Sequence, residues 1–159
     1  MPDFEVTVVS TMDELRQALA IRTRVFVEEQ GVPVAAEIDA YDSNPATDAR
    51  AVHFIGRLGG EPIATARLLL DPPAGEFPHI GRVAVLPEHR GRGYGRAIMA
   101  AAHAEAEARG FAGATLAAQL QALPFYERIG YVARGSVFRD AGIDHRLMDL
   151  RFERSTVDR

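Results

Sequence analysis

A glycine-rich segment between an apolar run and a helical run constrains the fold of this chain most strongly. The segment reads PEHRGRGYGRAI (87–98), with IGRVAVLP leading into it and AIMAAAHAEAEARG leading out. The first run is typical of a buried strand and the second of a helix. A strand that enters a helix through glycines leaves backbone N–H groups free at the helix N-terminus, where the helix dipole favours an anion. We therefore expect a mixed α/β fold whose glycine loop can hold a pyrophosphate.

The spacing of the glycines distinguishes between known anion-binding loops. The dinucleotide pattern Gly-x-Gly-x-x-Gly is not satisfied, because Arg96 stands where the third glycine belongs. The nucleotide-phosphate pattern fails as well, since no Gly-Lys-Ser/Thr occurs in the chain. Arg-x-x-Gly-x-Gly does fit, with Arg90, Gly93 and Gly95. The alternative interpretation is a tight turn flanked by solvated arginines.

The rest of the chain alternates between strand and helix patterns. Residues 4–10 alternate as a strand does, and Thr11 and Glu14 fit a capping box for a helix that runs to about Glu29. Residues 31–48 lack a regular pattern, and Gly59-Gly60-Glu61 predicts a hairpin turn. The later elements are a strand at 80–87, a helix at 95–109, a strand at 114–119, a short helix at 123–129 and an antiparallel pair at 131–138 and 145–152.

Composition excludes several classes of function. The chain has 159 residues and no cysteine, so disulfides, thiolate metal sites and cysteine nucleophiles are ruled out. Its net charge of −4 argues against nucleic acid as a partner. No apolar run is long enough for a membrane span, and the N-terminus does not resemble a secretory signal, so we expect a cytoplasmic protein. The histidines share no metal-ligand spacing, so no metal site is predicted. No serine lies in a nucleophile elbow, so a serine nucleophile is not predicted either.

Two blocks of sequence resemble one enzyme family. RVAVLPEHRGRGYGRAIM is similar to the acetyl-CoA-binding motif of GCN5-related N-acetyltransferases (GNAT), and LAAQLQALPFYERIGY to a later strand-and-helix block of that family. RTRVFVEEQGVPVAAEIDAYD resembles the first-helix region of the ElaA- and YjcF-like subgroup. The resemblance implies a single GNAT-like domain over 1–159. It also implies a mixed, mostly antiparallel central sheet of six to seven strands flanked by about four helices.

The resemblance also implies which residues bind the acetyl-CoA co-substrate. Backbone amides of the Arg-x-x-Gly-x-Gly loop hold the pyrophosphate in the family, and the strand before the loop pairs with the pantetheine arm. Gln119 stands where the family often has an asparagine that contacts the cofactor. The implied set is Val83, Ala84, Val85, Arg90, Gly91, Arg92, Gly93, Tyr94, Gly95, Arg96 and Gln119.

The implied catalytic residues are a general acid and a proton acceptor. Tyr126 matches the family's tyrosine beside the thioester sulfur, where a phenol can stabilise or protonate the leaving thiolate. The alternative is a tyrosine that packs in the core beside Phe125. His79 lies near the position where some family members have a basic glutamate, and histidine titrates near neutral pH. Other candidates are Glu37, Asp39 and Asp42, or a chain of water molecules, and a solvent-exposed role for His79 remains open.

Six acidic residues and no basic one lie between Val25 and Ala49. We interpret this segment as an acidic rim for a cationic amine, the alternative being a solvated loop. The predicted function is direct transfer of the acetyl group of acetyl-CoA to a small-molecule or protein amine in a ternary complex. A non-catalytic acyl-CoA-binding sensor or partner module is the alternative. The family resemblance is compatible with a homodimer, and the sequence does not identify the acceptor amine.

Overall fold

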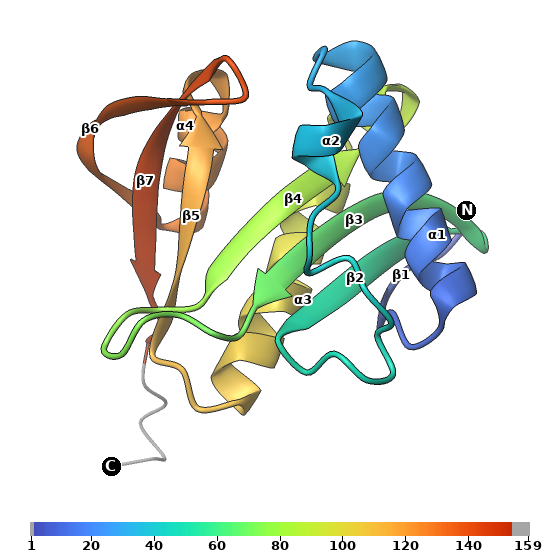
Figure 1. The fold of residues 1–159 in the computed structure, drawn as a ribbon, viewed down its shortest axis with the longest axis horizontal. Coiled ribbons are helices and arrows are strands. Elements are labelled where there is room, and N and C mark those ends of the chain that lie inside the picture. The colour runs from blue at the N-terminus through green and yellow to red at the C-terminus, as the bar shows by residue number, and fades with distance from the viewer. Residues whose placement is uncertain (1, 154–159) are drawn as a thin grey trace.

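A seven-stranded sheet with the order β1-β2-β3-β4-β5-β7-β6 forms the centre of the molecule (Figure 1). The computed structural model describes residues 2–153. Neighbouring strands are antiparallel except β4 and β5, which are parallel. The strands are β1 (Phe4–Val8), β2 (Ala51–Leu58), β3 (Glu61–Leu69), β4 (His79–Val85), β5 (Gly113–Gln119), β6 (Val132–Asp140) and β7 (Ile143–Arg151). The predicted mixed, mostly antiparallel sheet is confirmed.

Four α-helices and three other helical segments connect the strands of the described residues. The α-helices are α1 (Met12–Arg22), α2 (Val34–Glu37), α3 (Tyr94–Ala108) and α4 (Leu123–Ile129). The others are a π-helix, η1 (Thr23–Glu29), and two 3₁₀ turns, η2 (Pro87–His89) and η3 (Leu120–Ala122). In Figure 1, α1 and α2 cover the near face of the sheet, and α3 lies behind it.

The first helix differs from its predicted form beyond Arg22. Its capping box is confirmed, since the backbone N–H of Glu14 donates to Thr11 and the carboxylate of Glu14 accepts from the Thr11 backbone. The helix also ends near Glu29 as predicted, but residues 23–29 form a π-helix. A π-helical turn inserts an extra residue, which the 3.6-residue pattern cannot signal. Within the segment expected to be irregular, residues 34–37 form the short helix α2.

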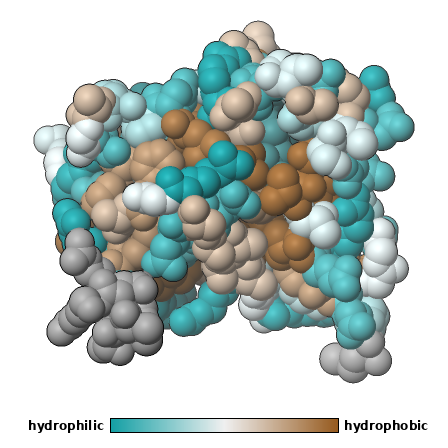
Figure 2. Space-filling view, turned by 90° about the horizontal axis from the view of Figure 1, so that it is seen from below, coloured by the Kyte–Doolittle hydropathy of each residue, from teal (hydrophilic) through white to brown (hydrophobic). Residues whose placement is uncertain are grey.

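The hydrophobic core is divided between the two faces of the sheet. The larger cluster packs Phe54, Leu68 and Ile80 against Ile98 and Met99 of α3. Smaller clusters lie under α1 and η1 on the opposite face. Apolar residues also reach the surface, where the view from below shows them in patches bordered by hydrophilic ones (Figure 2). Such patches are common on folded proteins, so they do not mark a site by themselves.

Two irregularities of β4 shape the middle of the sheet. The strand pairs with β5 only at His79 and Thr115, so the two strands separate beyond that point. On its other side, Thr65 pairs with Ala84 and Arg67 with Gly81, so Arg82 and Val83 lie opposite Ala66 alone. This arrangement is a β-bulge, and Arg82 adopts a positive φ of 53° within it.

No helix in residues 2–153 combines the length and hydrophobicity that a membrane crossing requires.

Candidate active site

A cavity of about 840 Å³ occupies the gap between β4 and β5. Its wall on one side is formed by β3, β4 and α2, and on the other by β5, η3, α4 and the β6–β7 hairpin. The glycine loop, the first turn of α3 and residues of η1 and the segment after it also contribute to the lining. Because β4 and β5 are paired at one position only, the inner edges of both strands keep backbone donors and acceptors for a ligand.

The glycine loop brings a helix N-terminus to this cavity. Gly91 and Gly93 have positive φ values of 78° and 86°, and Gly93 is the N-cap of α3. A Cβ atom at either position would meet no atom within 4 Å, so their absent side chains leave open space in front of the backbone. An L-residue with a side chain rarely adopts such φ values, which explains why glycines occur here. The loop therefore presents the first N–H groups of α3 to the cavity.

Arg90 anchors the glycine loop to the preceding elements. Its guanidinium donates to both carboxylate oxygens of Glu29, at 2.7 Å each, and to the carbonyl oxygen of Val85 at 3.0 Å. The exposed pair contributes little to global stability, but it fixes one end of the loop to η1. Arg96 lines the cavity, whereas Arg92 does not contribute to its lining.

Gln119 connects the two sides of the gap. Its side-chain amide donates to the side chain of Gln30 at 2.8 Å, and its oxygen accepts from Gln121. Gln30 follows the last residue of η1, so this contact bridges from the end of β5 to the helical layer. The amide expected at this position thus lines the cavity and has defined partners.

Tyr126 lies in the cavity wall with only 9% of its surface exposed. Its ring makes edge contacts with Phe125 and Tyr131, at centroid distances of 5.0 and 5.8 Å. Burial raises the pKa of Tyr126 to about 12, so the phenol is neutral at physiological pH. The hydroxyl of the neighbouring Tyr131 is engaged in a hydrogen bond with Nε2 of His103 at 2.7 Å. The ring of Tyr126 therefore packs in the core while the residue borders the cavity, and the catalytic role of Tyr126 stays a prediction.

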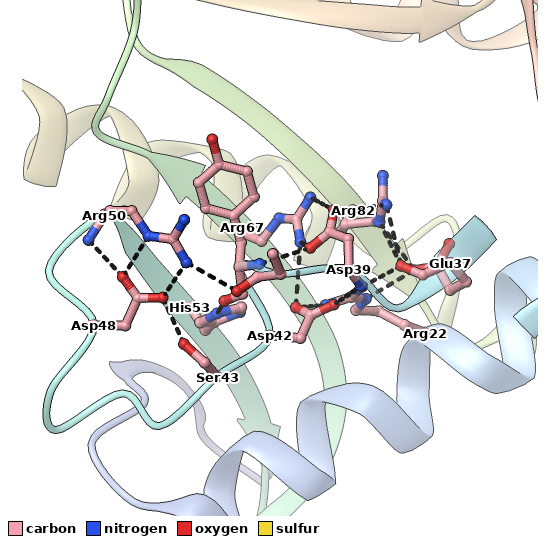
Figure 3. A network of polar contacts seen from close by, with 12 residues as sticks. Arg22, Glu37, Asp39, Asp42, Ser43, Asp48, Arg50, His53, Arg67 and Arg82 are labelled. Carbon is pink, nitrogen blue, oxygen red and sulfur yellow. Dashed lines mark hydrogen bonds and ion pairs between the residues drawn. The ribbon is translucent and has the colours of Figure 1, made fainter. Parts of the chain in front are cut away.

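A network of ion pairs lies beside α2, and three of its residues, Glu37, Arg67 and Arg82, line the cavity (Figure 3). It joins three guanidiniums with three carboxylates: Arg22, Arg67 and Arg82 with Glu37, Asp39 and Asp42. Arg22 donates to Glu37 at 2.8 Å and to Asp42 at 2.7 Å, and both side chains of the second pair are almost fully buried. Burial alone would raise the pKa of Asp42, but hydrogen bonds from Arg22 and the Asp39 backbone lower it to about 2.

Five of the six acidic residues of this segment are paired with arginines, so it does not present the uncompensated negative charge expected of an acidic rim. Glu37, Asp39 and Asp42 are neutralised by arginines that come from α1, β3 and β4, outside the acidic segment. Glu29 and Asp48 have arginine partners as well, in Arg90 and Arg50. The sequence pattern missed these partners because they are distant along the chain or lie just beyond the segment.

Within residues 2–153, His, Asp and Glu side chains do not gather in groups of three that could hold a metal ion.

Comparison with known proteins identifies the family. A sequence profile described as "Acetyltransferase (GNAT) family" matches residues 13–131, from α1 to just beyond α4. The chain belongs to the GNAT family. Among the similar proteins is the uncharacterised N-acetyltransferase YjcF of Bacillus subtilis, which is 34% identical over 145 residues that cover 91% of this chain and 97% of YjcF.

Solved GNAT-like structures share the whole fold. An acyl-CoA N-acyltransferase from Pseudomonas aeruginosa is 32% identical, with a TM-score of 0.78 over 94% of this chain and 99% of that one. ElaA from Escherichia coli is 26% identical, with a TM-score of 0.79 and the same coverage of 94% and 99%. The resemblance to the ElaA- and YjcF-like subgroup is therefore confirmed, and acyltransferase activity is supported at the level of the family.

The GNAT fold brings most of the predicted site residues to one cavity. Its lining includes Tyr126, His79 and Glu37, and also the predicted cofactor-binding residues, with one exception, Arg92. Asp39 and Asp42 do not contribute to the lining. The sequence analysis missed several lining residues that carry polar side chains, among them Arg67, Arg82 and His145. Arg82 directly precedes the predicted pantetheine strand, but only the bulge decides which way its side chain points.

Proposed function

We propose that this protein transfers the acetyl group of acetyl-CoA directly to an amine, with both substrates bound in one ternary complex. The observation that carries the proposal is the shared cavity, which is lined both by the glycine loop and by Tyr126 and His79. The loop supplies the anion site that a pyrophosphate needs, and the parted strands offer hydrogen-bonding edges to the two amides of a pantetheine arm. A cavity of about 840 Å³ is within the usual range for small-molecule sites.

In this proposal, binding relies on the backbone of residues 90–96 and on the edge formed by Val83, Ala84 and Val85. Gly93 allows the pyrophosphate to approach the N-terminus of α3 closely, and Arg96 adds a positive charge at the cavity. Gln119 contributes its amide at the opposite wall. The side chain of Arg90 holds the loop in place, since its guanidinium is already bonded to Glu29.

The chemistry proposed is attack of a neutral amine on the acetyl carbonyl carbon. A C–N bond forms as the C–S bond breaks, and the electron pair of that bond leaves with sulfur. Tyr126, which burial keeps protonated, donates a hydrogen bond and then a proton to the sulfur. The proton that the attacking nitrogen loses as the amide forms returns to the phenolate, directly or through water. With no cysteine in the chain, a direct transfer without a cysteine-bound acyl intermediate is the simplest route.

The proton of the amine requires an acceptor, because a primary amine with a pKa of ~10.4 is mostly protonated at neutral pH. We assign this role to His79, directly or through water, since it lies at the start of β4 and lines the cavity. Glu37 suits the role less well. Its Oε2 atom lies 3.1 Å from Arg82 and 2.8 Å from Arg22, so this oxygen is already engaged in two ion pairs.

The direct test combines binding with turnover. Calorimetric titration with acetyl-CoA measures the first step, and release of free coenzyme A thiol in the presence of a panel of amines measures the second. The proposal predicts micromolar binding and amine-dependent thiol release. Binding without turnover on any amine would favour the non-catalytic sensor, and absence of binding would contradict the proposal altogether.

A further inference from the structure

The acceptor side of the cavity has a guanidinium that the ion-pair network leaves partly uncompensated. Arg82 contacts Glu37 and Asp39 through Nε and Nη2 only, at distances of 3.1–3.3 Å. The corresponding contacts of Arg22 are shorter, at 2.7–2.9 Å. In Figure 3 the outer end of Arg82 points away from the carboxylates. Among residues 2–153, its Nη1 has no hydrogen-bond acceptor.

The charges around Arg82 agree with this geometry. Burial, followed by the neighbouring charge of Arg67, lowers the pKa of Arg82. The pKa of Arg22 is raised, because its hydrogen bonds to Asp42 and Glu37 outweigh the effect of burial. Of the three guanidiniums in the network, Arg82 is also the most accessible, with 24% of its side chain exposed against 1% for Arg22 and 5% for Arg67.

The bulge in β4 directs this side chain to the cavity. On a regular strand Gly81 and its successor would face opposite sides of the sheet. Here the extra residue of the bulge and the positive φ of Arg82 bring both residues into the cavity lining. Gly81 has no side chain, and a Cβ there would meet no atom within 4 Å, so the space beside Arg82 is open. Backbone strain of this kind persists where the surrounding structure enforces it, and it is concentrated at functional sites.

We propose that Arg82 binds an anionic group of the acceptor, so that the preferred acceptors are amines that also carry a carboxylate, such as amino acids. This inference rests on the proposed function and specifies its substrate class. It reverses the expectation of a cationic acceptor, because the acidic residues that suggested one are already paired with arginines. The Nη1 atom of Arg82 carries two N–H groups and part of the guanidinium charge, so it can donate charge-assisted hydrogen bonds to a carboxylate.

The test compares matched acceptors that differ in one charge. Thiol release is measured with a series of amino acids, with the carboxamide of each, and with a polyamine as the cationic reference. We expect kcat/KM to be at least about tenfold higher for the carboxylates, since a site built to bind a group rejects analogues that lack it. The amine of an amino acid carboxamide has a lower pKa than the amine of the parent amino acid, so more of it is neutral and able to attack. This difference favours the carboxamide, so a preference for the acid would not arise from amine reactivity.

Variants of Arg82 locate the origin of the preference. Arg82→Gln is expected to remove the discrimination between acid and carboxamide while leaving the KM for acetyl-CoA within about twofold, and Arg82→Lys to retain part of it. Arg16→Gln, which alters an exposed arginine on α1, serves as the control. A discrimination that persists in Arg82→Gln would overturn the assignment to Arg82.

A binding measurement keeps the inference separate from the proposed function. The enzyme saturated with coenzyme A is titrated calorimetrically with an N-acetylated amino acid and with its carboxamide. We expect binding of the acid only, and loss of that binding in Arg82→Gln. If wild-type protein binds acetyl-CoA but neither binds nor acetylates carboxylate-bearing amines in preference to the others, the inference is wrong while the proposed function stands. Failure to bind acetyl-CoA would instead contradict the proposed function.

Discussion

Ile80 and Ala84 lie four residues apart on β4, yet they pack on opposite faces of the sheet. Ile80 belongs to the cluster beneath α3, whereas Ala84 contacts the cluster of Ile21 and Val25 beneath α1 and η1. A regular strand would place both on one face, because side chains alternate with a period of two. The bulge at Arg82 and Val83 inserts the residue that reverses this pattern. A single short strand therefore contributes residues to the core on both faces of the sheet and also to the cavity lining.

Substitution of Gly93 tests the glycine loop. Gly93→Glu places bulk and negative charge where a pyrophosphate would lie, at a φ of 86° that glutamate adopts poorly. We expect calorimetric binding of acetyl-CoA to be lost. Gly75→Glu is a matched control, since Gly75 has a φ of 83°, equally open space and no part in the cavity lining. Equal binding by both variants would show that the loop is only a turn.

Removal of the Tyr126 hydroxyl tests the proposed general acid. Tyr126→Phe keeps the ring and its contacts with Phe125 and Tyr131, so the fold and the affinity for acetyl-CoA should change little. We expect kcat to fall about 100-fold, the usual contribution of a positioned general acid. Steady-state thiol release measures this change, and an unaltered kcat would eliminate Tyr126 from the chemistry.

The raised pKa of Tyr126 predicts how the stability of the protein changes at alkaline pH. The pKa of Tyr126 is about 12 in the fold and ordinarily 10, so the folded state holds this proton more tightly than the unfolded chain. Stability therefore decreases as the pH rises from about 10 toward 12. Thermal unfolding between pH 8 and 11.5 should show a smaller decrease for Tyr126→Phe than for the wild type. Parallel curves for the two proteins would contradict the raised pKa.

The buried ion pairs predict a large effect at one carboxylate. Asp42→Asn removes a negative charge whose side chain is 0% exposed and leaves Arg22 and Arg67 short of a partner. We expect a loss of roughly 3 kcal/mol in the free energy of unfolding, as for other broken buried pairs. Urea denaturation gives the value. Asp13→Asn removes a carboxylate that is 90% exposed and should cost less than about 0.5 kcal/mol.

His103 predicts sensitivity to acid. Burial lowers the pKa of His103 to about 4, and its Nε2 is bonded to the Tyr131 hydroxyl. Because the unfolded chain binds this proton more readily, the stabilising contribution is complete above about pH 6.5 and is lost as the pH falls toward 4. Melting temperatures between pH 7 and 4.5 should therefore decrease less steeply in His103→Leu. A slope that does not depend on residue 103 would rule out this contribution.

Local sequence was sufficient for most of the secondary structure and for the glycine loop that lines the cavity. Thr11 and Glu14 act within one helical turn, and Gly91 and Gly93 are required by the φ values of a single loop, so neighbouring residues carry this information. The π-helix at 23–29 escaped prediction, because its extra residue depends on packing rather than on local propensity. The pairing of the acidic side chains of residues 37–42 with arginines escaped prediction for a related reason, because those arginines lie on other elements.

By itself, the sequence determined the glycine loop, the order of the elements and the family, since each depends on short spacings that survive in the folded chain. Only the tertiary structure decided which charged side chains line the cavity beside α2. The partners of Glu37, Asp39 and Asp42 are arginines that lie 15–45 positions away along the chain. The bulge that turns Arg82 into the cavity depends equally on the register of β4 against β3. Charge compensation and strand register arise from contacts between distant segments, and no local pattern records them.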